Sequence, residues 1–155
     1  MSTRCVTLVR EVRRNWRTGE SGPEEIMRFY RHCDGYPSGH GVDIAEAILE
    51  TGDHKRYCTS WSQNVIGNLL LKDACMEIEP KETVHGDLEY LYVIEADEDT
   101  GFRRYGKDID SIADDVTISV FGTGWDVPYE EATAREPLFS GTASEYLKWV
   151  YEVHE

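Results

Sequence analysis

Residues 26–41, IMRFYRHCDGYPSGHG, contain the transition on which the fold of this chain depends. Residues 25–31 alternate their side chains between two faces, as a strand does. The strand then gives way to a turn that holds three glycines and Pro37, and a helical pattern begins at Val42. We therefore predict a strand, a glycine-rich turn and a helix N-terminus in direct succession, an arrangement that commonly builds a small binding site.

Further elements can be predicted on both sides of this corner. Residues 4–12 are rich in β-branched side chains and are expected to form a hairpin with residues 25–31 across a polar turn. Ser60 is a candidate N-cap for a second helix. The expected strands are 4–12, 25–31, 88–95, 102–105 and 116–121, and the expected helices are 42–49, 60–74 and a final one capped by Ser140 or Thr142, with residues 122–141 irregular.

The order of these elements lacks the regular strand–helix alternation of a doubly wound fold. It predicts an α+β fold: a mostly antiparallel sheet of about four to five strands with two to three helices packed on one face. A chain of 155 residues is expected to form a single globular domain, residues 1–155.

Composition predicts a cytoplasmic protein without membrane contact. Arginines interrupt the apolar residues of the N-terminus, unlike a secretory signal, and no apolar run approaches the roughly 20 residues of a spanning helix. The four cysteines, Cys5, Cys33, Cys58 and Cys75, include no C-x-x-C pair, so we expect free thiols rather than a disulfide.

The net charge of −14 is unevenly distributed along the chain. Residues 1–60 hold nine basic and nine acidic residues, whereas residues 61–155 hold seven basic and twenty-one acidic ones. Such a surface repels nucleic acid and attracts a protein partner with a basic surface. An arginine stripe beside Trp16 would suit a single strand, but the total charge argues against nucleic-acid binding. Solubility or adaptation to high salt explains the same composition, and the sequence leaves this open.

The glycine-rich turn is the predicted ligand or partner site. Its glycines allow backbone amides to face a ligand, and the amides of the helix N-terminus favour an anion such as a phosphate. An equally simple interpretation is structural, since Asp-Gly is a common turn pair. The candidate site residues are Arg31, His32, Asp34, Gly35, Tyr36, Gly39, His40 and Gly41.

His32, Asp34 and His40 could form a general base with an orienting carboxylate, but no established catalytic or metal-binding motif occurs in the sequence. His32 and Cys33 would point to opposite faces of a strand, and no Walker, G-x-S-x-G, H-E-x-x-H or G-x-G-x-x-G motif occurs. Structural zinc normally requires two closely spaced ligand pairs, which the histidines and cysteines do not provide. We therefore predict no catalytic residue, metal or cofactor.

Two segments carry a resemblance to known proteins. Residues 30–41, YRHCDGYPSGHG, resemble the Y-R-H-x-D-G-Y-P-x-G-x-G segment of a family of small phage- and prophage-type proteins without an assigned activity. Residues 86–94, GDLEYLYVI, resemble the G-D-x-E-Y-x-Y-x-I strand of the same family, and residues 2–5 resemble its start. The resemblance implies a phage or mobile-element context and no particular reaction.

Two functional hypotheses follow. The first is a non-enzymatic accessory or interaction protein that binds a protein partner through an acidic surface. The alternative is a binding protein or hydrolase for a small molecule, either a phosphorylated ligand or a nucleotide, that uses the strand–turn–helix site at residues 31–41. The sequence does not decide the oligomeric state.

Overall fold

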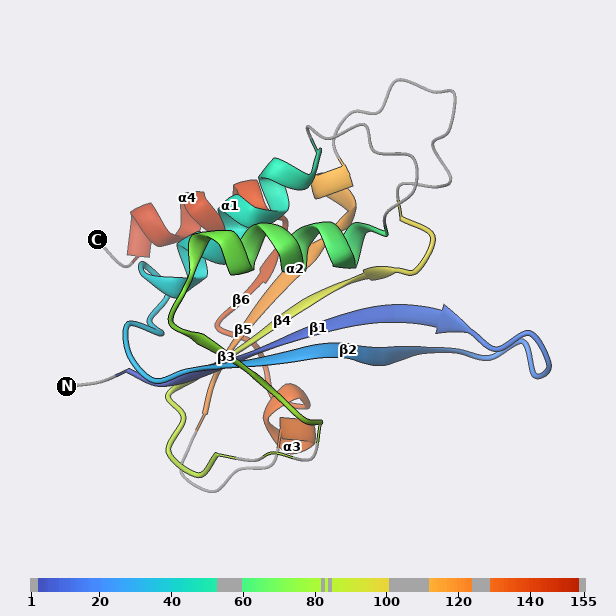
Figure 1. Cartoon of the computed structure of the whole chain (residues 1–155), viewed down its shortest axis with the longest axis horizontal. Coiled ribbons are helices and arrows are strands. Elements are labelled where there is room, and N and C mark those ends of the chain that lie inside the picture. Colours follow the sequence, from blue (N-terminus) through green and yellow to red (C-terminus); the bar gives the residue numbers. More distant parts are fainter. Residues whose placement is uncertain are drawn as a thin grey trace.

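A computed structural model of the chain describes residues 3–52, 60–81, 83, 85–100, 112–123 and 129–153. These residues form an α+β fold around a six-stranded mixed sheet with the strand order β3-β2-β1-β4-β5-β6 (Figure 1). The strands are β1 (Cys5–Arg14), β2 (Ser21–Arg31), β3 (Met76–Glu79), β4 (Tyr90–Asp97), β5 (Thr117–Gly122) and β6 (Phe139–Gly141). The helices are α1 (His40–Gly52), α2 (Trp61–Lys72), the 3-10 turn η1 (Ile112–Asp115), α3 (Tyr129–Thr133) and α4 (Ala143–Val153).

Strand β1 lies at the centre of the sheet and is buried on both faces. It pairs with β2 in an antiparallel hairpin and with β4 in parallel, while the other neighbours pair antiparallel. The side chains of β1 alternate: Cys5 and Val9 join the core beneath the helices, and Val6 and Leu8 join a second core on the opposite face. The expectation of a mostly antiparallel sheet is confirmed.

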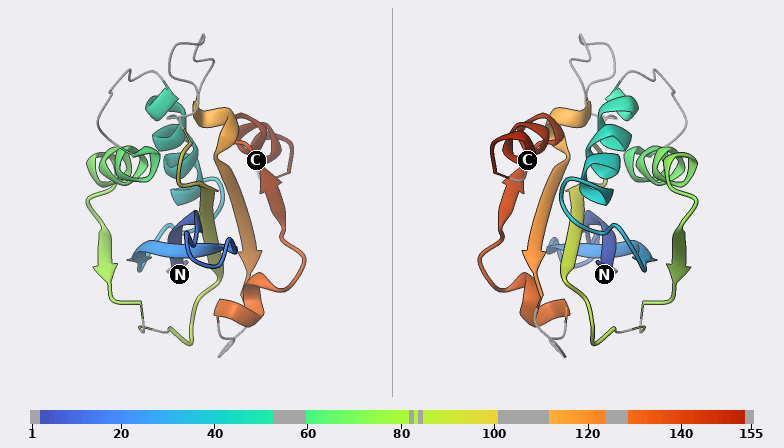
Figure 2. Two further views of the ribbon diagram at one scale, coloured as in Figure 1. Left: turned by 90° about the vertical axis from the view of Figure 1, so that its right-hand side faces the viewer. Right: turned by 90° about the vertical axis from the view of Figure 1, so that its left-hand side faces the viewer.

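Helices α1, α2 and α4 lie together on one side of the sheet, and α3 lies on the other (Figures 1 and 2). Ser60 caps α2, because its hydroxyl accepts a hydrogen bond from the Gln63 amide. Thr142 caps α4, where its hydroxyl accepts from the Glu145 amide and the Glu145 carboxylate accepts from the Thr142 amide. Of the two expected caps of the last helix, the structure selects Thr142.

The predicted count of four to five strands was too low, because the sheet has six. The prediction that all helices pack on one face was also incomplete, because α3 lies on the other face. The segment β3 reads MEIE, with two apolar residues, and is too short for a clear period-two pattern. Residues 122–141, expected to be irregular, include α3 and β6. These elements are short and gain their stability from the sheet beside them, so local sequence gives little sign of them. The strand expected at 102–105 lies outside the described residues.

Two of the glycines that lie in helices differ in their surroundings, because the fold leaves no room for a side chain at the first of them but leaves open space at the second. A Cβ on Gly41, in the first turn of α1, would collide with the Tyr146 hydroxyl of α4. A Cβ on Gly67, inside α2, would meet nothing within 4 Å. Gly41 therefore permits the close approach of α1 and α4, whereas Gly67 only weakens its helix.

Replacing these two glycines by alanine should have opposite effects on stability. Gly41→Ala should lower the free energy of unfolding by about 2 kcal/mol or more, because Tyr146 must move. Gly67→Ala should raise it by about 0.5–1 kcal/mol through helix propensity. Urea unfolding measures both values, and equal effects of the two substitutions would contradict the packing described here.

Candidate functional site

The predicted site begins where β2 ends at Arg31 and continues to the start of α1 at His40. Alternation along the strand separates its side chains. Arg31 follows Phe29 on the helical face of the sheet, whereas His32 follows Tyr30 on the opposite face. Two of the predicted donors, Arg31 and His32, are thus separated by the sheet.

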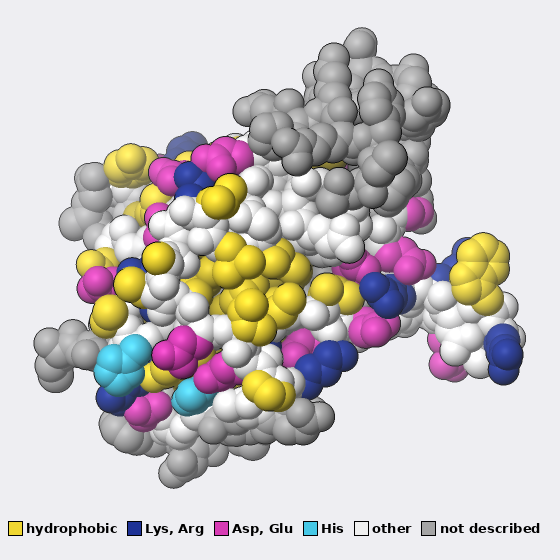
Figure 3. Space-filling model, in the orientation of Figure 1, with side chains coloured by type: hydrophobic (Ala, Val, Ile, Leu, Met, Phe, Trp, Pro, Cys, Tyr) yellow, Lys and Arg dark blue, Asp and Glu magenta, His cyan; other side chains and the backbone are white. Residues whose placement is uncertain are grey.

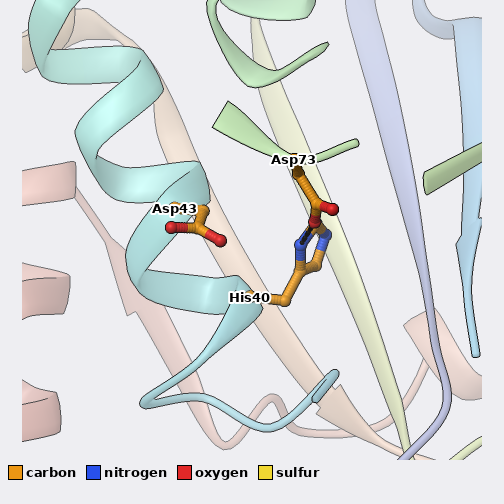
Figure 4. Close-up of side chains that lie close together, drawn as sticks. All are labelled: His40, Asp43 and Asp73. Carbon is orange, nitrogen blue, oxygen red and sulfur yellow. Dashed lines mark hydrogen bonds and ion pairs between the residues drawn. The ribbon is translucent and has the colours of Figure 1, made fainter. Parts of the chain in front are cut away.

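On the helical face, four side chains from distant parts of the chain form a continuous network. The Thr7 Oγ1 of β1 lies 2.9 Å from His40 Nε2, and His40 Nδ1 lies 2.9 Å from Asp73 Oδ2. Asp73 follows α2 and also accepts a hydrogen bond from the Arg31 guanidinium. Figure 4 shows the His40 imidazole directed at Asp73, with Asp43 one turn further along α1. The network joins β1, β2, α1 and the end of α2.

The hydrogen bonds define the roles of the two imidazole nitrogens. An ionised Asp73 carboxylate can only accept, so the His40 Nδ1 carries the proton in the neutral ring and donates it. The Nε2 then accepts from the Thr7 hydroxyl. The other Asp73 oxygen accepts from the Cys75 amide at 2.9 Å. Each polar atom of the network therefore has a partner within the chain.

Charge balance fixes the ionisation of Asp73. Burial alone would raise the pKa of its carboxyl, but the hydrogen bonds from His40 and the Cys75 amide, with the positive charge of Arg31, outweigh burial and lower that pKa. Burial raises the pKa of the nearby Asp43, even though His40 and Arg31 oppose that change. Asp73 is therefore the main anionic partner of Arg31.

The order hydroxyl, imidazole, carboxylate is also that of a catalytic triad. A catalytic hydroxyl, however, must reach a substrate, and Thr7 and His40 have exposed fractions of 0% and 1%. Tyr92 packs edge-on against the His40 ring. The arrangement can position secondary structure, but it cannot bring a reacting atom to Thr7 without opening the core.

A metal ion would find three ligand atoms here, but the cation position is already taken. His40, Asp43 and Asp73 each place one ligand atom within 4.8 Å of the others. The Arg31 guanidinium bonds to Asp73 and lies 3.7 Å from the Asp43 carboxylate. Arginine thus supplies the positive charge that these carboxylates need, and a metal would have to displace it.

The turn itself is held by the surrounding structure. The Tyr92 hydroxyl donates to the Gly35 carbonyl at 2.7 Å, and the Tyr146 hydroxyl donates to the Pro37 carbonyl at 2.7 Å. A Cβ on Gly35 would lie 2.8 Å from the Cys5 side chain. These contacts fill the inner side of the turn, where the glycines were expected to face a ligand.

Asp34 gives the turn its shape. It adopts a positive φ of 56°, and its carbonyl accepts from the His40 amide at 3.1 Å. A Cβ on Gly39 would lie 2.7 Å from that carbonyl. The Asp34 carboxylate is exposed and lies 3.9 Å from Arg31. The structure thus brings Arg31, Asp34 and His40 together, and leaves the side chain of Tyr36 exposed at the surface.

His32 belongs to a separate polar group on the opposite face. Its Nδ1 lies 3.1 Å from the Tyr30 hydroxyl and accepts from Arg4 Nε at 3.3 Å. Tyr30 in turn stacks on His85, with ring centroids 3.9 Å apart, and His85 Nε2 lies 2.7 Å from Glu79. The eight predicted residues therefore occupy two faces of the sheet rather than one site.

Sequence reasoning missed Thr7, Asp73, Tyr92 and Tyr146 as partners of the corner. Asp73 follows a helix that ends in Lys72, a position that looked like an ordinary helix end. Thr7 sits among apolar residues of β1, where a hydroxyl pointing inward needs a buried partner. A hydroxyl at such a position, with no partner apparent in the neighbouring sequence, was the one local signal of a buried polar network.

Comparison of the chain with protein-family models, curated proteins and solved structures finds no match in any of the three. Among the described helices, none has the length and apolar character needed to cross a membrane. The described thiols Cys5, Cys33 and Cys75 are free, and Cys58 lies outside the described residues.

Substitution of Asp73 should give a pH-dependent loss of stability. Because the folded-state pKa is lowered, the carboxylate stabilises the fold above its unfolded pKa and loses this effect as the pH falls through the folded value. Asp73→Asn should lower the free energy of unfolding by about 3 kcal/mol at neutral pH, since Arg31 loses its buried partner. This difference from the wild type should shrink below about pH 4.

Denaturant unfolding at a series of pH values measures this difference. Substitution of the exposed Asp114 by Asn removes the same charge and serves as the control, with little effect expected at any pH. A cost for Asp73→Asn that stays constant into the acid range would contradict the assignment of Asp73 as the ionised partner.

Proposed function

We propose that this chain is a non-enzymatic interaction protein that binds a protein partner with a basic surface. The observation that carries the proposal is the burial of the one hydroxyl–imidazole–carboxylate network found among the described residues, together with its complete internal pairing. An anionic ligand of the turn would need the Arg31 guanidinium. That guanidinium already donates to the Cys33 carbonyl and forms ion pairs with Asp73 and the neighbouring carboxylates. Exposed groups on the surface are what remains for recognition.

The partner-binding surface is the outer side of the helical layer, which we call the acidic helix surface. Its exposed carboxylates come from three elements that pack together, since α1 contacts both η1 and α4. Figure 3 shows acidic side chains at the upper edge of the helical layer, with basic and hydrophobic side chains among them. The surface comprises Glu46 and Glu50 of α1, Asp114 and Asp115 of η1, and Glu145 and Glu152 of α4.

Two lysines of the described residues lie near these carboxylates. Lys72 lies 2.6 Å from Glu50 and 3.5 Å from Glu46, and Lys148 is exposed on α4. Hydrogen bonds from Thr142 lower the pKa of Glu145, which stays ionised well below neutral pH. The field of such a surface speeds the approach of a basic protein and weakens as salt screens it.

The context of this binding is that of a phage or mobile element, as the resemblance of residues 30–41 implies. An acidic protein of this kind acts by occupying a basic surface on a host or viral protein. Surfaces that normally hold nucleic acid are the natural class of target, because they present arginine and lysine at high density.

Neutralising the acidic helix surface should abolish partner binding while the fold is kept. The triple variant Glu46→Gln, Asp114→Asn, Glu152→Gln removes three exposed charges from three elements. Exposed single charges of this kind contribute little to stability. In quantitative pull-downs, a partner retained by the wild type at moderate salt should be lost with this variant and at high salt.

The matched control places the same charge change elsewhere. Glu20→Gln, Glu89→Gln, Glu136→Gln also removes three exposed carboxylates, so both variants have the same net charge. Retention of the partner by the control and its loss from the helix variant support the proposal. Equal loss from both variants, or no partner for the wild type, would contradict it.

A further inference from the structure

Strand β3 ends the sheet on the side opposite to β6. Among the described strands it pairs with β2 alone, so one of its two long sides faces no other strand. Backbone N–H and C=O groups point alternately to the two sides of a strand, and those on the free side of β3 are available to a further strand. Figure 2 shows β3 and α2 along the same outer edge of the molecule. The described part of the chain can therefore be extended by strand pairing at this edge.

The helical face of this edge is apolar and incompletely covered. Ile78 pairs with Phe29, so its side chain points to the same face as that core residue, yet it is 59% exposed. Leu70, one turn after the buried Ile66 of α2, is 40% exposed. Figure 3 shows hydrophobic side chains exposed between α2 and the strands below it. An apolar side chain on a strand added beside β3 would cover Ile78 and remove this area from water.

The opposite face of the same edge is acidic. Glu77 pairs with Tyr30, and its side chain is exposed on that face. Glu79 lies on the same face, where His85 Nε2 lies 2.7 Å from its carboxylate. Glu77 is therefore the exposed charge at the centre of the edge. The strand, with the sequence MEIE, presents apolar residues on one face and carboxylates on the other.

We propose that β3 binds an extended segment of a partner protein, which joins the sheet as a seventh strand. The backbone of the segment pairs with the free side of β3, in the mode of β-strand addition. Its apolar residues lie beside Ile78 on the helical face, and its lysine or arginine residues lie opposite Glu77 on the other face. The segment is thus recognised as a strand in which apolar and basic residues alternate. This contact is separate from the acidic helix surface and does not depend on it.

Charge disfavours a second copy of β3 as the occupant. Residues opposite each other in an antiparallel pair point to the same face of the sheet, so a two-fold pairing of β3 joins residues of the same face. In the two such registers that overlap more than one residue of β3, Glu77 lies opposite Glu77 or Glu79 of the other copy. Like charges in directly opposite positions are destabilising. The glutamate that repels another copy attracts a basic residue.

Three synthetic peptides with blocked termini test this recognition. KVKVKV has the proposed pattern, EVEVEV has the opposite charge, and KKKVVV has the composition and charge of the first peptide without its alternation. An extended KKKVVV cannot place its valines on one face and its lysines on the other. Only KVKVKV should bind the full chain, as measured by NMR titration. Its binding should shift the amide signals of β3 and slow the hydrogen exchange of the amides on the free side of that strand.

Variants of the edge identify the two contacts. Glu77→Lys should raise the dissociation constant of KVKVKV at least about tenfold and should allow EVEVEV to bind, because the charge preference is reversed. Glu20→Lys makes the same charge change at an exposed site outside β3 and should leave the constant unchanged. Ile78→Thr keeps a β-branched residue in the strand and should weaken binding, whereas Leu138→Thr, at an exposed apolar site next to β6, should not.

Several outcomes would overturn the proposal. They are a chain that binds none of the peptides, equal affinities for KVKVKV and KKKVVV, and an affinity that Glu77→Lys leaves intact. Shifts confined to the acidic helix surface would also reject the addition of a strand at β3, while leaving the proposed function standing.

Discussion

The buried ion pair between Arg31 and Asp73 is the constraint on which the corner of this fold depends. An arginine held against the helical layer at the end of β2 cannot be left without a counter-charge, and the carboxylate of Asp73 comes from the C-terminal end of α2. Once Asp73 is in place, it orients His40, and His40 reaches Thr7 on the central strand. One carboxylate therefore sets the relative positions of β1, β2, α1 and α2.

This constraint explains why the turn is closed on its inner side. Holding α1 against the sheet brings Tyr92 and Tyr146 to the carbonyls of Gly35 and Pro37, and leaves no space for a side chain at Gly41. The contacts that hold the turn in place also occupy its carbonyl groups as hydrogen-bond acceptors. Recognition is then left to exposed features outside the turn: the carboxylates of the helical layer and the free side of β3.

Sequence reasoning located the strand, turn and helix of residues 26–41, because glycines and proline mark such transitions locally. It also identified Ser60 and Thr142, whose capping roles depend on residues only three positions away. It could not find Asp73, which lies 33 residues from His40, since nothing local distinguishes a buried carboxylate from a solvated one. The strands β3 and β6 were missed because they are only four and three residues long and depend on pairing with distant strands. The eight candidate residues of the turn were expected to form one site, although the pleat of β2 places Arg31 and His32 on opposite faces of the sheet.

The most direct test of the central claim is the protonation of His40 observed by nitrogen NMR of the imidazole at about pH 8, where a free histidine is neutral. The account predicts a ring protonated at Nδ1, with a slowly exchanging proton held by Asp73 and with Nε2 accepting from Thr7. A ring protonated at Nε2, or one whose proton exchanges as fast as that of an exposed histidine, would contradict it.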